Sequence, residues 1–161
     1  MIRITDQYVW NIVCLLFFLW LVVIGGMILE YKDSMSYVDL TLFDLVLISL
    51  ASFRVIRLFV YDSVTKFFRE QFYDAKVTKT GTVTLHKPAK GLRRTIIDLL
   101  SCPWCFGVWA TAMVTFFYLL TPIAFFPILI LAVSAVATWL QLFANMIGWK
   151  AEQLKRDVET S

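Results

Sequence analysis

The feature that most constrains this chain is a long run, Leu99–Trp149, without a single charged side chain. A helix needs about 20 apolar residues to cross a hydrocarbon core about 30 Å thick. The run is therefore too long for one crossing and long enough for two. Thr121 and Pro122 break it near its middle, because the residue before a proline disfavours helix. The run predicts two membrane-spanning helices, at about 104–120 and 123–147.

Two further apolar segments come earlier in the chain. The segment at about 9–29 has no charge and no cleavage pattern after it, which predicts a retained span rather than a signal peptide. The segment at about 40–61 contains Asp44 near its start and Arg54 and Arg57 near its end. A charge at a helix centre costs about 2.5–3.5 kcal/mol, but an arginine near a helix end reaches the lipid headgroups. We therefore expect this segment to span as well.

Composition supports a membrane protein. Apolar residues make up 60% of the chain and its mean hydropathy is +0.74, above the usual range of soluble domains. We predict an all-α polytopic protein with four transmembrane helices in a single membrane domain over 1–161, with a long loop at 62–100 and a tail at 150–161. Three cysteines do not make a disulfide scaffold, so the pair at Cys-x-x-Cys spacing indicates a local site at most.

The polar loop contains signals for three local elements. Residues 63–73 place valine and phenylalanine at helical spacing against charged residues, which predicts an amphipathic helix lying in the membrane interface. A Thr- and Val-rich stretch at 77–85 with a central glycine predicts a small β-hairpin. Residues 92–100 return to helical spacing. The mixed-charge tail after Trp149 is expected to be frayed.

Lysine and arginine are distributed unequally between the two faces that four spans define. Of the 15 Lys and Arg residues, only Lys32 falls in a loop on the face opposite the termini. By the positive-inside rule, the other face is cytoplasmic. Trp10, Trp104 and Trp149 are placed where the aromatic belt of that face is expected. We predict a multi-pass protein of the cell inner (cytoplasmic) membrane with both termini in the cytoplasm.

The charge-free run opens close to Cys102 and Cys105, a Cys-Pro-Trp-Cys stretch. If Cys102 is a helix N-cap, Pro103 occupies the first helical position, where its missing N–H costs nothing. Cys105 then lies in the first turn, where unpaired N–H groups and the helix dipole favour a thiolate. The pair is a redox site, half of a four-cysteine zinc site, or two small packing residues, and all three interpretations stay open.

Basic side chains near the loop form a second candidate site. Arg54 and Arg57 either contact lipid phosphates or form ion pairs with acids at the same border, Asp62 or Asp98. The loop also offers a surface for anionic lipid or a cytoplasmic partner, for which we single out Lys66, Arg69, Arg93 and Arg94. Nucleic acid is not an expected partner, because no binding motif accompanies the charge.

Together these motifs resemble a catalogued family of small bacterial and phage membrane proteins of unknown function. The residues that carry the resemblance are Arg54-Val55-Ile56-Arg57, Asp62, Cys102-Pro103-Trp104-Cys105 and Trp109. The similarity covers roughly 42–142. The family includes a protein linked to sporulation, which implies a biological role without implying a chemistry.

The sequence contains no Gly-rich phosphate loop, no Ser/His/Asp grouping and no paired catalytic carboxylates. We therefore expect a non-enzymatic interaction or assembly protein that docks partners or anionic lipid through its basic loop and forms a homo-oligomer or binds another membrane protein. No cofactor is expected unless zinc binds. The alternatives are a thiol-redox or zinc-site membrane protein using Cys102 and Cys105, and a small pore such as a phage holin.

Overall fold

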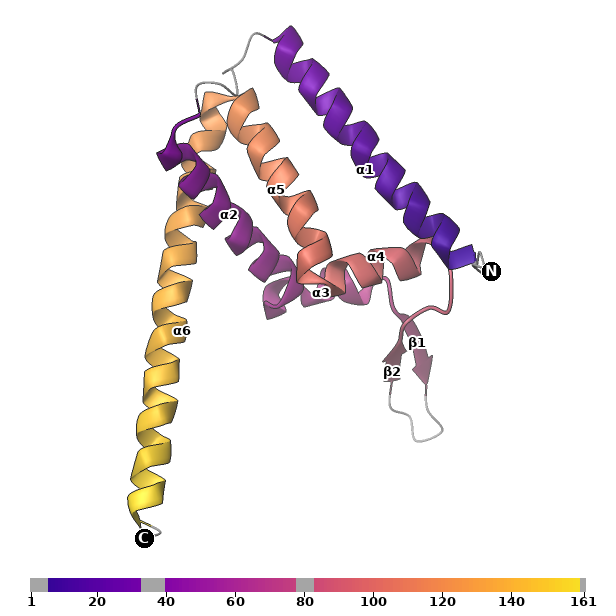
Figure 1. Cartoon of the computed structure of the whole chain (residues 1–161). Coiled ribbons are helices and arrows are strands. Elements are labelled where there is room, and N and C mark those ends of the chain that lie inside the picture. Colours follow the sequence, from indigo (N-terminus) through magenta and orange to yellow (C-terminus); the bar gives the residue numbers. More distant parts are fainter. Residues whose placement is uncertain (1–5, 33–39, 78–82, 160–161) are drawn as a thin grey trace, which may run out of the picture.

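The structure, a computed structural model, describes residues 6–32, 40–77 and 83–159 (Figure 1). Within these ranges the chain is mostly helical, and its α-helices are α1 (Asp6–Tyr31), α2 (Leu42–Val60), α3 (Lys66–Glu70), α4 (Leu92–Ser101), α5 (Pro103–Leu120) and α6 (Phe125–Glu159). Two strands, β1 (Asp74–Val77) and β2 (Val83–His86), pair in one antiparallel sheet. Single 3-10 turns at Ser63–Thr65 and Pro122–Ala124 precede α3 and α6. The mostly helical fold that the sequence predicts is confirmed.

Within the described residues, three helices are long and apolar enough to cross a membrane. They cover Gln7–Tyr31, Pro103–Leu120 and Pro122–Glu159. The second predicted span forms α2, but this helix is not one of the three, because its 19 residues include Asp44, Arg54 and Arg57. That α2 also crosses the membrane stays a prediction.

The core lies where α2 packs against both α5 and α6 (Figure 1). Small residues make the contact close, since Ala51 of α2 and Ala135 of α6 have no exposed surface. Leu47, Ile48 and Val114 fill the space around them. Helix α1 runs beside α5 and contacts α5 and α4, with most of its side chains exposed. The packed core of the described helices is therefore built around α2.

Helices α3 and α4 and the sheet gather at one end of the helices, below α5 in Figure 1. The helix predicted over 63–73 is shorter in the structure, a 3-10 turn followed by the five residues of α3. Phe68 of α3 packs edge-on against Phe59 of α2, and Phe59 in turn contacts Phe106 of α5. The predicted hairpin forms with Val77 opposite Val83, and its predicted central glycine, Gly81, lies outside the described residues.

Helix α6 is longer than the predicted span and continues through the tail to Glu159. The tail expected to be frayed is thus helical as far as Glu159. An ion pair one turn apart, Arg156 to Glu152 at 3.6 Å, supports the helix there. From Trp139 to Glu159 every residue is exposed, and Figure 1 shows this half of α6 extending away from the other helices.

Candidate functional site

The Cys-Pro-Trp-Cys stretch forms the corner between α4 and α5. Cys102 is the N-cap of α5, with an extended backbone, and its Sγ accepts a hydrogen bond from the backbone N–H of Cys105 at 3.3 Å. Pro103 occupies the first turn, where a missing N–H costs nothing. The local structure is the one expected from the sequence, because an N-cap acceptor followed by proline is a helix-start signal.

The two thiols of this corner face each other. The Sγ atoms of Cys102 and Cys105 lie 2.7 Å apart, and both cysteines are free, as is Cys14 in α1. Hydrogen bonds from the Cys105 side chain and then from its backbone N–H hold the pKa of Cys102 below its ordinary value. Cys102 is therefore the thiol of the pair whose environment favours a nucleophilic thiolate.

The same corner was considered as half of a zinc site. Among the residues that the structure describes, no group of three or more His, Cys, Asp or Glu side chains comes together. Structural zinc is usually held by four such ligands. The described part of this chain thus contributes two thiols, and a zinc site here would need further ligands from outside the described residues.

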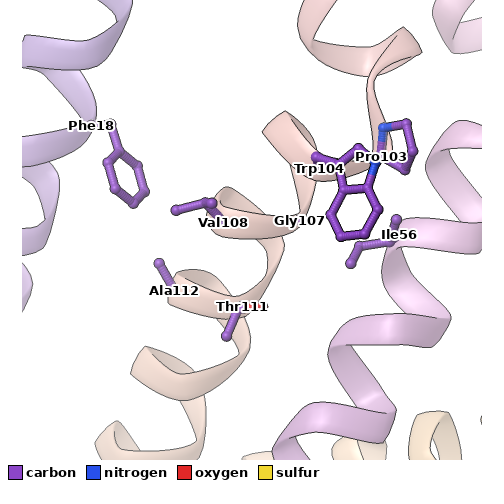
Figure 2. A pocket seen from close by; sticks show the side chains of 8 residues that line it. All are labelled: Phe18, Ile56, Pro103, Trp104, Gly107, Val108, Thr111 and Ala112. Carbon is purple, nitrogen blue, oxygen red and sulfur yellow. The ribbon is translucent and has the colours of Figure 1, made fainter.

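An open apolar groove of about 560 Å³ lies beside the corner (Figure 2). Figure 2 shows α5 between α1 and α2, with Phe18 reaching in from α1 and Ile56 from α2. The groove is lined by Phe18, Ile56, Pro103, Trp104, Gly107, Val108, Thr111 and Ala112. Trp104 is 86% exposed although it is the largest side chain of the corner. An exposed tryptophan at a helix start is typical of a membrane interface.

The arginines that end α2 have different surroundings. Arg54 forms an ion pair with Asp62 at 3.4 Å, and both side chains are half-buried. Arg57 lies over the ring of Tyr61, with 5.5 Å between its guanidinium carbon and the ring centroid. Its Nε is buried and has no hydrogen-bond partner among the described residues. The structure thus brings Arg54 to Asp62, one of the two acids considered for it.

The other acid, Asp98, lies on α4 and serves a different cluster. Its carboxylate pairs with Arg94 at 2.7 Å and with Lys87 at 3.4 Å. Arg94 also donates to the backbone oxygen of Pro88 at 3.4 Å. These contacts tie the start of α4 to the segment that leads out of β2.

The remaining basic residues singled out from the sequence also make contacts within the loop. Arg69 donates to the backbone oxygens of Val60, the last residue of α2, and of Asp62, which precedes the 3-10 turn. Arg93 pairs with Asp74 at 3.0 Å and donates to two backbone oxygens ahead of β1. Lys66 pairs with Glu70 one turn away. The arginines therefore help to hold the loop in one arrangement, a role with no local sequence signal because the partners are far apart.

Two polar clusters were missed altogether at the sequence level. Gln7 of α1 donates to Thr95 of α4 at 2.8 Å and accepts from the backbone N–H of Gly91 at 3.2 Å. At the other end of the bundle, the hydroxyl of Tyr118 donates to Asp44, which also caps α2 with Thr41. These contacts join α1 to α4 and α5 to α2 across long sequence separations.

The family of proteins of unknown function called DUF1360 matches residues 47–144 of this chain. The chain belongs to this family. The matched stretch begins in α2 and ends in α6, so it includes the thiol corner, the loop and two walls of the groove. The resemblance found in the motifs is confirmed.

Two relatives from Bacillus subtilis (strain 168) are each similar to more than half of this chain. The sporulation protein YjcA is 37% identical over 98 residues, which cover 58% of this chain and 83% of YjcA. The UPF0713 protein YngL is 29% identical over 118 residues, which cover 71% of this chain and 88% of YngL. No solved structure matches this chain. The family therefore includes a sporulation protein, as expected.

Proposed function

We propose that this protein crosses the inner membrane four times, has both termini in the cytoplasm, and works as a non-enzymatic interaction and assembly protein. The packing of α2 supports the fourth crossing. Its buried Leu47, Ile48 and Ala51 lie against helices that are themselves long enough to span. Its charges stay near the ends, where Asp44 bonds Tyr118 and Arg54 bonds Asp62. Asp44 and Arg54 thus each have a partner, which lowers the free energy of burying these two charges.

The observation that carries the proposal is the exposed C-terminal half of α6. Residues 139–159 extend for about 30 Å at 1.5 Å per residue, without cover from the rest of the described chain. Leu140, Ile147 and Leu154 are each at least 60% exposed. Lipid covers such side chains within the span, but Leu154 and Val158 lie beyond Lys150, where an uncovered apolar surface marks an interaction site. We assign this half of α6 as the docking surface for protein.

The loop is the proposed contact to anionic lipid. Val64 and Phe67 are 72% and 67% exposed beside Lys66, an arrangement that suits the boundary between acyl chains and headgroups. Arg69, Arg93 and Arg94 mainly hold the loop together, so lysine and the apolar side chains carry more of this contact than the sequence implied.

Photo-crosslinking tests the docking surface. A benzoylphenylalanine replaces Phe143, which is exposed, and in a matched control replaces Leu47, which is buried against α5 and α6. Irradiation of intact membranes should give protein adducts heavier than the 18.6 kDa chain from position 143 and none from position 47. Adducts to lipid alone at position 143, with normal membrane insertion, would contradict the proposal.

The thiol corner favours a second function, exchange with a disulfide of a partner protein. The Cys102 thiolate would attack the partner's disulfide, which forms a mixed disulfide and releases one partner thiol. Cys105 would then attack Cys102 Sγ, which forms the Cys102–Cys105 disulfide and releases the second partner thiol, so this chain would lose two electrons and two protons that the partner gains. The 2.7 Å approach of the two sulphurs supports this assignment. Maleimide labelling of Cys102 and Cys105 in membranes distinguishes a redox pair, a metal site and two packing residues. Rapid labelling indicates accessible thiols, and labelling only after a strong chelator indicates a bound metal. No labelling in either condition indicates that the two side chains are buried by packing.

A further inference from the structure

We propose that α6 pairs in parallel with α6 of a second copy of this chain, along a heptad stripe in the exposed half of the helix. This inference rests on the proposed function, because it names the partner for the docking surface on α6.

The stripe is defined by two alternating sets of residues in the C-terminal half of α6. Alanines recur every seven residues, and a larger aliphatic residue follows each alanine after three positions. All members are exposed, and they are Ala137, Leu140, Ala144, Ile147, Ala151, Leu154 and Val158. Spacing of three and four residues in alternation is the pattern of a coiled-coil seam.

The stripe does not coincide with the face by which α6 joins its own bundle. Ala132 and Ala135 are buried against α2, and Trp139 contacts Phe53. At 100° per residue, Ala137 points about 160° away from Ala135, and Leu140 about 80° away from Ala132. From Trp139 to Glu159 no residue of α6 is buried against the bundle. A second copy can therefore reach the stripe without displacing α2.

The course of the stripe distinguishes a protein partner from lipid. Ala151, Leu154 and Val158 lie beyond Lys150, where every other residue of α6 is polar or charged. Acyl chains do not cover side chains outside the hydrocarbon core, so the apolar stripe of the tail favours a protein surface over lipid. The residues of the tail continue the register of the alanines within the apolar segment without a break.

The alternation of small and large residues favours a second copy as that surface. Copies that insert in the same orientation can be related by a two-fold axis along the membrane normal. Each residue of the stripe then meets the same residue of the second copy, so the alanines form one set of layers and the larger aliphatic residues form another. Alanine layers let the two helices approach closely, as small residues do between membrane helices. Leucine and isoleucine layers then fill the seam as knobs into holes.

The parallel arrangement makes a specific prediction about charge. Lys150 and Lys155 flank the seam on either side. In a parallel pair, Lys150 of one copy lies beside Lys155 of the other, so these two side chains repel each other in the wild-type dimer. Lys155→Glu turns both repulsive contacts of the two-fold pair into attractive ones. The dimer should become about fivefold tighter at low salt, with less gain at high salt.

Disulfide trapping of the full-length protein in membranes tests the pairing. In a background with all three cysteines replaced by serine, Ala151→Cys and Leu154→Cys lie on the stripe, and Gln153→Cys lies on the opposite face. Oxidation should give at least about tenfold more covalent dimer from the stripe positions than from Gln153→Cys. Sedimentation equilibrium of the Lys155→Glu variant in detergent supplies a second measurement that does not depend on cysteine.

The outcomes separate self-pairing from the proposed function. Equal trapping at the three positions together with a monomer at all concentrations overturns self-pairing. Protein adducts from position 143 would then leave α6 as a docking surface for a different protein. If position 143 gives no protein adduct either, both proposals fail. A Lys155→Glu variant that is less dimeric than wild type overturns the parallel arrangement.

Discussion

Trp139 of α6 lies against Phe53 of α2, with ring centroids 6.0 Å apart and ring planes at 57°. Beyond Trp139, α6 has no buried residue through Glu159. The pair therefore marks the point where the packed part of α6 ends and its exposed half begins.

Breaking this pair should loosen the bundle. Trp139→Ala and Phe53→Ala should show a coupling of about 1 kcal/mol in a double-mutant cycle, because an aromatic pair contributes roughly that beyond its buried area. Unfolding by dodecyl sulfate in mixed micelles measures it. Trp149→Ala, which removes a 71% exposed ring, is the control and should leave stability unchanged. A coupling of zero would mean that the two rings do not hold α6 to α2.

Gly107 should tolerate alanine but not leucine. A Cβ at this position would lie 3.3 Å from Cδ1 of Ile56, a gap that Ile56 can relieve by a small shift. The gain in helix propensity opposes that cost, so Gly107→Ala should be nearly neutral. Gly107→Leu should cost about 1–3 kcal/mol because α2 must move away from α5.

The matched control for that series is Gly26→Leu, since nothing lies within 4 Å of a Cβ at Gly26. Ile56→Ala should restore much of the stability that Gly107→Leu loses. Equal losses for Gly107→Leu and Gly26→Leu in the same unfolding assay would show that α2 and α5 do not touch at this glycine.

Removing the hydroxyl of Tyr118 should destabilise the protein without changing the shape of the ring. Tyr118 is 8% exposed and donates to Asp44 at the start of α2. Tyr118→Phe leaves the carboxylate short of a donor, at a cost of about 1–2 kcal/mol. Tyr31→Phe removes a hydroxyl from a 95% exposed ring and should have no effect on the same unfolding measurement.

The reactivity of Cys102 should depend on Cys105. Since the thiol and N–H of Cys105 lower the pKa of Cys102, its thiolate should form at lower pH than that of an ordinary cysteine. Cys105→Ala removes the thiol and keeps the N–H. Peptide mass spectrometry measures the alkylation rate of Cys102 as a function of pH. In Cys105→Ala the pH midpoint of this rate should rise but stay below the ordinary pKa of a cysteine. An unmoved midpoint would show that the two thiols do not interact.

Features with local signals could be predicted from the sequence. Cys102 as N-cap with Pro103 behind it, the break at Thr121, and α4 all depend on neighbours within one or two helical turns. Binary pattern and proline chemistry act at that range, so the chain needs no tertiary information to define them.

Features that depend on tertiary contacts could not be predicted in the same way. Tyr118 and Asp44 are 74 residues apart in the sequence, and Arg93 and Asp74 are 19 apart. No local residue spacing predicts contacts at these separations. The helical tail is a different case. Its apolar residues, Ala151, Leu154 and Val158, already follow the helical period, but mixed charges at the end of a chain are also typical of a frayed tail.

The side of the membrane on which the docking half of α6 lies depends on whether α2 crosses. In a cysteine-free background, Lys32→Cys follows α1 and Lys150→Cys lies in the exposed half of α6. A membrane-impermeant maleimide added to intact cells should label Lys32→Cys at once and Lys150→Cys only after the cells are opened. Labelling of both positions from outside would show that α2 does not cross, and would contradict four spans with a cytoplasmic docking surface.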